Sequence, residues 1–114
     1  MHRFSMPPED RIRLLHMIEA ATEAISFIAD KTRTELENDR KTLFAVIRCV
    51  EIIGEAAAKV SEATRSTAPD VPWSAIVGMR NRLVHAYFDV DSEVVWKTVT
   101  TELPGLRCRL QQLL

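Results

Sequence analysis

The sequence predicts an all-α fold, a single bundle of four to five helices. Apolar residues recur at helical spacing over two long segments, and no stretch alternates apolar and polar residues for long enough to form a strand. The 114 residues include only three glycines, and their Ala, Leu, Glu and Arg content favours helix. A chain of this length has room for one hydrophobic core. We therefore expect one domain over residues 1–114, with residues 1–6 as a loose N-terminal extension.

The first helix is predicted from about Glu9 to Ala29. Pro8 followed by two acidic residues suits a helix start, because proline loses no hydrogen bond there and negative charge favours the N-terminal end. The apolar face that we expect to be buried consists of Ile18, Ala21, Ile25 and Ile28, widened by Leu14, Leu15 and Met17.

The second helix is predicted from about Asp39 to Glu62. Its apolar seam keeps its register for about five turns and consists of Leu43, Val46, Ile47, Val50, Ile53, Ala57 and Val60. Gly54 lies inside this helix, where glycine costs about 1 kcal/mol relative to alanine. A glycine at such a position indicates close approach of another backbone, within the bundle or across a subunit interface. The spacing of the polar face favours a ladder of exposed ion pairs over a functional row, and this face carries Arg48, Glu51, Glu55 and Lys59.

Two further helical segments are predicted in the second half of the chain. One begins near Pro72 and Trp73 and carries the apolar residues Ile76, Val77, Met79 and Leu83. The other begins after Asp91, a candidate N-cap, and Pro104 breaks or kinks it before an apolar face continues to the C-terminus.

Composition limits the classes of function. The net charge of −1 means that the surface as a whole should not attract polyanions, so nucleic acid would need a local site. No apolar run approaches the roughly 20 residues that cross a bilayer, and the N-terminus lacks the apolar core of a signal peptide, so we expect a cytoplasmic protein. Cys49 and Cys108 have no further cysteine or histidine at metal-ligand spacing. We expect both to be buried free thiols, and we expect no metal or cofactor.

The stretch RNRLVHAY, residues 80–87, combines polar side chains that a packing surface does not require. Arg80 and Arg82 supply fixed positive charge suited to phosphate oxygens, and Asn81 adds a neutral donor and acceptor. His85 can exchange a proton near neutral pH. Tyr87 offers a ring that can stack on a base and a hydroxyl group. These are the groups that metal-free cleavage of RNA requires, with imidazole transferring protons and arginine stabilising the phosphorane.

A structural interpretation of the same stretch stays open. Arg and His near a helix C-terminus can satisfy free carbonyls and the helix dipole, and the acids that follow could pair with them. Those acids are Asp89, Asp91 and Glu93. They could orient His85 and Arg82, although helix capping in solvent is their simpler role.

A regular helix would not bring Arg80 and His85 together. At 100° per residue, the histidine points about 140° away from the arginine. Either the helix ends or distorts near Val84, or the two side chains meet across a subunit boundary.

Arg80-Asn81, three further residues, His85, one residue and Tyr87 match the R-x4-H-x-Y signature of HEPN domains. Four blocks in order resemble the HepT-like branch of that family and cover nearly the whole chain. They are PPEDRIRLLHMIEA (7–20), AVIRCVEIIGEAAAKVSE (45–62), PDVPWSAIVGMRNRLVHAYFDVD (69–91) and VVWKTVTTELPGL (94–106).

The resemblance implies a homodimeric helical bundle that acts as a metal-independent endoribonuclease toxin of a type VII toxin–antitoxin pair. It implies an RNA substrate, with tRNA the expected one, and a minimal nucleotidyltransferase antitoxin as partner. Arg80 and His85 become the catalytic pair, with Asn81, Arg82 and Tyr87 as accessory substrate-binding residues, and Tyr87 becomes the site of AMP addition by the antitoxin. A two-fold dimer would supply two histidines to one cleft, so we expect a composite site at the interface.

Two other hypotheses are compatible with the sequence. The chain could be a catalytically inactive helical partner that binds a nucleotidyltransferase and presents Tyr87 for AMP addition. It could also be a plain dimeric scaffold whose motif caps a helix.

Overall fold

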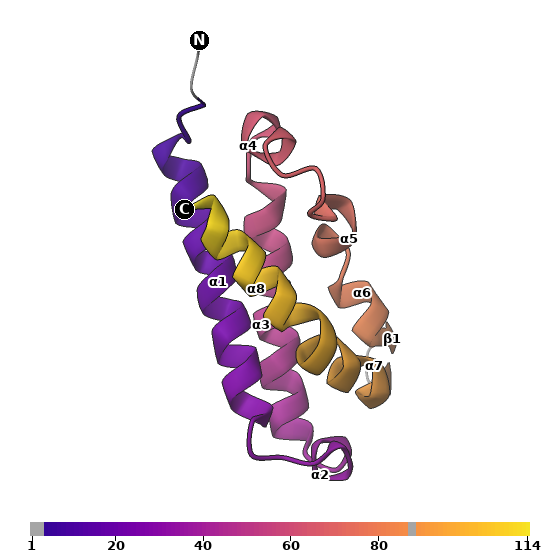
Figure 1. Ribbon diagram of the computed structural model, residues 1–114. Coiled ribbons are helices and arrows are strands. Elements are labelled where there is room, and N and C mark those ends of the chain that lie inside the picture. Colours follow the sequence, from indigo (N-terminus) through magenta and orange to yellow (C-terminus); the bar gives the residue numbers. More distant parts are fainter. Residues whose placement is uncertain (1–3, 87–88) are drawn as a thin grey trace.

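Two long antiparallel helices form the centre of the computed structural model, which describes residues 4–86 and 89–114. Helix α1 (Pro8–Ile28) runs the length of the molecule, and α3 (Arg40–Ala58) returns beside it. Figure 1 shows the two side by side, joined at one end through the short helix α2 (Arg33–Glu37). The predicted all-α architecture is therefore confirmed.

The predicted seam of the second helix is confirmed, whereas the face of the first is rotated. All seven predicted seam residues between Leu43 and Val60 are buried, although α3 ends at Ala58 rather than at Glu62. In α1 the buried stripe is Leu14, Met17, Ala21, Ala24 and Ile28. Ile18 and Ile25 pack only partly against this core, and Leu15 is exposed. The small alanine side chains let α3 approach closely. The buried stripe is therefore centred on the alanines and not on the larger isoleucines.

Polar capping side chains mark where helices end and begin at both ends of this pair. Thr32 and Glu35 form a capping box at the start of α2, and the Asp39 carboxylate accepts the Thr42 backbone N–H at the start of α3. At the opposite end Ser61 caps α4 (Glu62–Ser66). These caps explain why the region from residue 30 to residue 41 turns sharply instead of continuing a helix.

The segment after Pro72 is broken where a single helix was expected. Helix α5 (Trp73–Val77) and helix α6 (Arg80–Leu83) are separated by a turn at Gly78 and Met79. Gly54 of α3 explains where α5 lies, because the absence of a side chain lets the two backbones approach closely. A Cβ atom at residue 54 would lie 3.0 Å from the carbonyl oxygen of Val77 and 3.3 Å from that of Ile76. The close backbone approach predicted at Gly54 therefore occurs within the bundle. Val77, one of the apolar residues of this segment, is 43% exposed because its backbone faces α3 instead.

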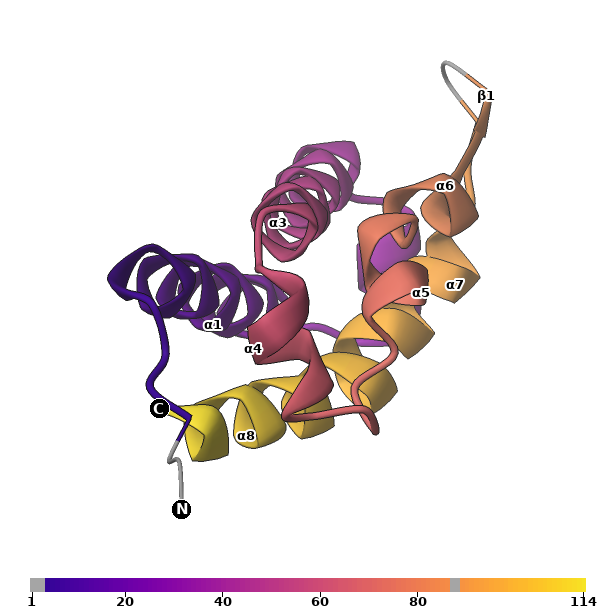
Figure 2. The same ribbon diagram turned by 90° about the horizontal axis from the view of Figure 1, so that it is seen from above.

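A short antiparallel hairpin follows α6, where no strand was expected. Strand β1 (Val84–Ala86) pairs with β2 (Asp89–Val90), with Val84 opposite Val90, and the Asp91 N–H donates to the Leu83 carbonyl at 2.8 Å. Strands of three and two residues are too short for the alternating pattern that identifies a strand in a sequence. Figure 2 shows β1 projecting away from the helices.

The last part of the chain crosses the long pair as one distorted helical rod. Helix α7 (Ser92–Lys97) leads into a π-helical turn, η1 (Thr98–Glu102), and then into α8 (Leu103–Leu113). Pro104 lacks an N–H and its ring collides with the preceding turn, so a wider turn ahead of it relieves the collision. The predicted distortion at Pro104 is confirmed, and α8 returns towards the start of α1 (Figures 1 and 2).

The two cysteines differ in environment. Cys49 is buried as predicted, and burial raises the pKa of its thiol. The prediction was wrong for Cys108, which is exposed because α8 buries only Leu103 and Leu110 on its inner face. Within residues 4–86 and 89–114, no helix is long and apolar enough to cross a membrane.

Candidate active site

The motif residues lie where α6 gives way to β1. Arg80, Asn81 and Arg82 belong to α6 and are exposed, whereas Leu83 between them and the hairpin is fully buried. His85 is the middle residue of β1, and 56% of its side chain is exposed. The helix thus ends just before Val84, as the first of the two alternatives predicted, but Arg80 and His85 line different hollows of the chain and are not brought together. Tyr87 lies outside the described residues.

Arg80 and Asn81 line a hollow of about 330 Å³ between α3 and α5. Gly54 and Val77, whose backbones are in close contact, also line this hollow. The glycine therefore allows Arg80 to lie against the middle of α3. Glu51 and Glu55 of α3 line the same hollow. Glu55 pairs with Arg48 at 3.4 Å, so the two carboxylates share this hollow with the exposed Arg80 side chain without an ion pair to it among the described residues.

The polar face of α3 does not form the expected ladder. Arg48 pairs with Glu55, seven residues on, at 3.4 Å, whereas the expected rungs from Arg48 to Glu51 and from Glu55 to Lys59 are not formed within the part of the chain that the structure describes. Glu51 and Glu55 instead share a hollow with Arg80. Only the packing of α5 and α6 onto α3 brings these acids to the motif, and the spacing of acids along α3 carries no signal of it.

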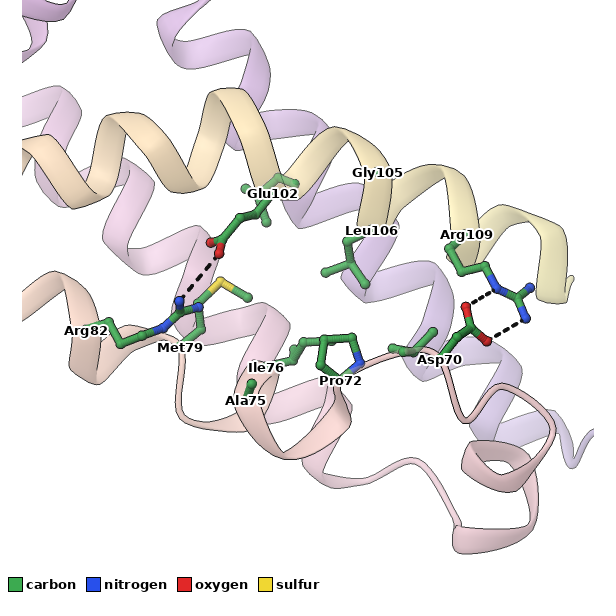
Figure 3. A pocket seen from close by; sticks show the side chains of 12 residues that line it. Asp70, Pro72, Ala75, Ile76, Met79, Arg82, Glu102, Gly105, Leu106 and Arg109 are labelled. Atoms are coloured by element: carbon green, nitrogen blue, oxygen red, sulfur yellow. Dashed lines mark hydrogen bonds and ion pairs between the residues drawn. The ribbon is translucent and has the colours of Figure 1, made fainter.

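Arg82 points to a different side of α6. Its guanidinium lies 3.4 Å from the Glu102 carboxylate, at one end of an apolar hollow of about 370 Å³ between α5 and α8 (Figure 3). At the other end Arg109 donates two hydrogen bonds to Asp70, at 2.8 and 3.0 Å. Residues two apart on a helix point about 200° apart, so Arg80 and Arg82 cannot serve the same hollow of one chain.

His85 lies in a third hollow, also of about 330 Å³, between α2, β2 and the start of α7. Its Nε2 atom is 3.2 Å from Oδ2 of Asp91, while Oδ1 of the same carboxylate accepts the Val94 backbone N–H at 3.1 Å. Asp91 is thus the N-cap that was predicted and also a partner of the histidine. The hydrogen bond from Val94, followed by the contact with His85, lowers the pKa of Asp91, so its carboxylate is ionised near neutral pH.

Asp89 and Glu93, two of the acids that the sequence analysis considered as partners of His85, line the same hollow. Arg33 and Glu37 of α2 also line it and were not predicted, and Arg33 forms an ion pair with Glu93 at 2.6 Å. Four carboxylates against one guanidinium give this hollow a negative balance, which disfavours a phosphate on the side of the ring that faces the acids. Among residues 4–86 and 89–114, no group of three or more His, Cys, Asp and Glu side chains is arranged to hold a metal ion.

The structure combines a helical bundle with an exposed Arg-Asn pair, a short turn into a strand and an exposed histidine, which are the features expected of a HEPN domain. Residues 17–113 match the family described as Ribonuclease HepT-like. The chain is 41% identical over 100 residues to "Probable ribonuclease HepT" from Thermococcus cleftensis, covering 84% of this chain and 91% of that protein. It is 34% identical over 110 residues to a "Putative RNase" from Methanocaldococcus jannaschii, covering 96% of this chain and 95% of that protein. No solved structure matches the chain.

The chain therefore belongs to the HepT-like ribonuclease family, as its four sequence blocks indicated.

Proposed function

We propose that the protein is a metal-independent endoribonuclease that cleaves RNA with Arg80 and His85. The observation that carries this proposal is the exposure of Arg80, Asn81 and His85 around a single buried anchor, Leu83. None of these three side chains packs into the core, and exposure of a base, a cation and an amide on one short segment suits a bound substrate. Membership of a ribonuclease family supports the same assignment.

The active centre in this proposal is shared between two subunits. In one chain the hollows that contain Arg80 and His85 are separate, and each motif has one histidine. Cleavage through a ribose 2′-hydroxyl needs one group that accepts a proton and another that gives one. A two-fold homodimer that faces the two motifs towards each other supplies two His85 imidazoles and two Arg80 guanidinium groups. Positive charge from the partner would also offset the acids around His85.

The proposed reaction balances without any cofactor. One His85 takes the proton of the 2′-hydroxyl while O2′ forms a bond to phosphorus, and the bond from phosphorus to O5′ breaks. The second His85, protonated beforehand, gives its proton to the departing O5′. Arg80 stabilises the charge on the phosphorane oxygens, with Asn81, Arg82 and Tyr87 as accessory contacts. The products are a 2′,3′-cyclic phosphate and a 5′-hydroxyl end.

The cellular role in this proposal is that of a type VII toxin. A minimal nucleotidyltransferase would act as the antitoxin by adding AMP to Tyr87, which is two residues from His85 in the sequence. Transfer RNA is the expected substrate, and the cytoplasm the expected location.

The test compares the wild-type protein with His85→Ala on total tRNA without added metal. General acid–base catalysis contributes roughly 10²- to 10⁴-fold, so the variant should lose cleavage by about that factor. Because His85 is exposed, the thermal midpoint and the dimer measured by light scattering should not change. Equal cleavage by both proteins would refute the assignment. A monomeric variant with full activity would refute the shared site.

A different outcome would favour the inactive-partner hypothesis. It consists of no cleavage by the wild-type protein, stable binding to a nucleotidyltransferase, and a mass gain of one AMP on Tyr87.

A further inference from the structure

The hairpin places a carboxylate against one nitrogen of His85. We propose that Asp91 is a positioning residue, which holds Nε2 of His85 and leaves Nδ1 as the nitrogen that exchanges the proton with RNA. The consequence for catalysis rests on the proposed ribonuclease function, whereas the orientation of the ring can be tested without it.

The charge on Asp91 decides which ring nitrogen of His85 carries the proton. The Asp91 carboxylate is ionised near neutral pH, because the hydrogen bond from Val94 and the contact with His85 lower its pKa. An ionised carboxylate only accepts hydrogen bonds. At 3.2 Å from Oδ2, Nε2 of His85 must therefore be the donor. A neutral imidazole with its proton on Nε2 has its lone pair on Nδ1, which becomes the base.

Hydrogen bonds hold the Asp91 carboxylate in place. Val84 and Val90 are paired across the hairpin, and the register shifts at His85, which follows Val84. The Asp91 N–H closes the hairpin onto the Leu83 carbonyl, and its Oδ1 atom accepts a hydrogen bond from the first turn of α7. Because its backbone N–H and its Oδ1 atom are both bound, Asp91 keeps little side-chain freedom, and its Oδ2 atom is a fixed acceptor for the ring.

Other charged side chains line the hollow that contains His85 and Asp91. They come from α2, from β2 and from α7, and are Arg33, Glu37, Asp89 and Glu93. Arg33 holds Glu93 in an ion pair at 2.6 Å, which occupies that alternative acceptor on α7. Asp91 covers the Nε2 side of the ring, so a phosphate can meet the imidazole only from the Nδ1 side.

Two substitutions separate positioning from capping. Asp91→Ser keeps an N-cap but is too short to reach the imidazole, whereas Asp91→Asn keeps the cap through its single amide oxygen and offers the ring an N–H donor in place of an acceptor. We expect kcat for tRNA cleavage to fall about tenfold in Asp91→Ser with KM unchanged, because Asp91 does not touch the substrate. Asp91→Asn should lose at least as much, because its amide N–H favours the tautomer whose proton is on Nδ1. Asp39→Ser is the matched control, since Asp39 caps α3 in the same way and its replacement should leave kcat unchanged.

The coupling to His85 is measured in a double-mutant cycle. In a His85→Ala background, Asp91→Ser should cause no further loss of the residual rate. Wild-type kcat in Asp91→Ser, wild-type kcat in Asp91→Asn, or an undiminished loss in the His85→Ala background would each overturn the proposal.

A spectroscopic measurement decides the orientation whether or not the protein cleaves RNA. Nitrogen–proton correlation spectra at alkaline pH distinguish the two neutral imidazole tautomers. The wild-type His85 should be protonated on Nε2 alone, and Asp91→Ser should show a mixture. Protonation of wild-type His85 on Nδ1 would overturn the proposal. Absence of RNA cleavage together with the Nε2–H tautomer would refute the ribonuclease and leave the positioning intact.

Discussion

The long helix pair and the motif segment are built in opposite ways. Helices α1 and α3 have 21 and 19 residues and bury seven and nine of them. Helix α6 has four residues and buries only Leu83, and the hairpin after it has strands of three and two residues. The pair carries the core, whereas the motif segment is held by one apolar anchor and by backbone and carboxylate contacts. We therefore predict that substitutions in the long pair change the free energy of unfolding, whereas substitutions in the motif segment change RNA cleavage.

Removing a buried side chain from the long pair is expected to have the largest effect on stability. Ile53 of α3 is fully buried, so Ile53→Ala should lower the free energy of unfolding by about 2 to 5 kcal/mol, while the same protein kept below its melting temperature should still cleave RNA. Urea denaturation measures the first effect and a tRNA assay the second. Ile12→Ala on α1 is the control, because Ile12 is 50% exposed and its loss should change stability by less than about 0.5 kcal/mol. A similar cost for both variants would refute the core assignment.

The separation should break down at Gly54, where the two regions meet. A leucine there would press its Cβ against the carbonyl oxygens of Val77 and Ile76, at 3.0 and 3.3 Å. We expect Gly54→Leu to cost about 2 to 3 kcal/mol in urea denaturation and to reduce RNA cleavage as well, because α5 and the arginine after it must move.

Gly105→Leu is the matched control for that variant. Gly105 is also inside a helix, but a Cβ there would meet nothing within 4 Å. Leucine favours helix, so the control should be stabilised by up to about 1 kcal/mol. Equal stabilities for the two leucine variants would show that the backbone contact at Gly54 does not constrain the fold.

A smaller effect is expected at Asp10, the polar contact that closes the far end of the long pair. This buried carboxylate accepts hydrogen bonds from the Ser61 N–H at 3.0 Å and from the Ser61 and Thr64 hydroxyls at 2.5 Å each. Asp10→Ala should lower the free energy of unfolding by about 1 to 2 kcal/mol, because buried donors lose their acceptor. Glu9→Ala, at the exposed neighbouring position, should have little effect.

The same contact predicts a pH dependence. Burial raises the pKa of Asp10, but the hydrogen bonds from Ser61 and Thr64 outweigh it and bring the pKa below its ordinary value. A group whose pKa is lowered by folding stabilises the protein above the pKa of the unfolded chain, about 3.9. That contribution is lost as the pH falls through the pKa of the folded state. The difference in stability between wild type and Asp10→Ala should shrink below about pH 4, and a constant difference would contradict the assigned hydrogen bonds.

The parts of the fold that follow from local pattern were predictable. The seam of α3, the cap at Asp91 and the distortion at Pro104 each depend on residues close together in the sequence. The motif was recognisable for the same reason, since Arg80, Asn81 and His85 lie within six positions. The exposure of Cys108 and Val77, and the hairpin after α6, were not predictable. They depend on how far α5, α6 and α8 approach the long pair.

The sequence by itself determined the two long helices, the order of the helical segments, and the identity of the groups that could act on RNA, because spacing along the chain dictates which side chains share a helix face. Only the tertiary structure decided the short helices, the break after Val77 and the neighbours of the motif. Packing against Gly54 placed Arg80 in one hollow with Glu51 and Glu55, and the hairpin set Asp91 against His85. Such contacts arise from the close approach of backbones, and no periodicity in the sequence records it.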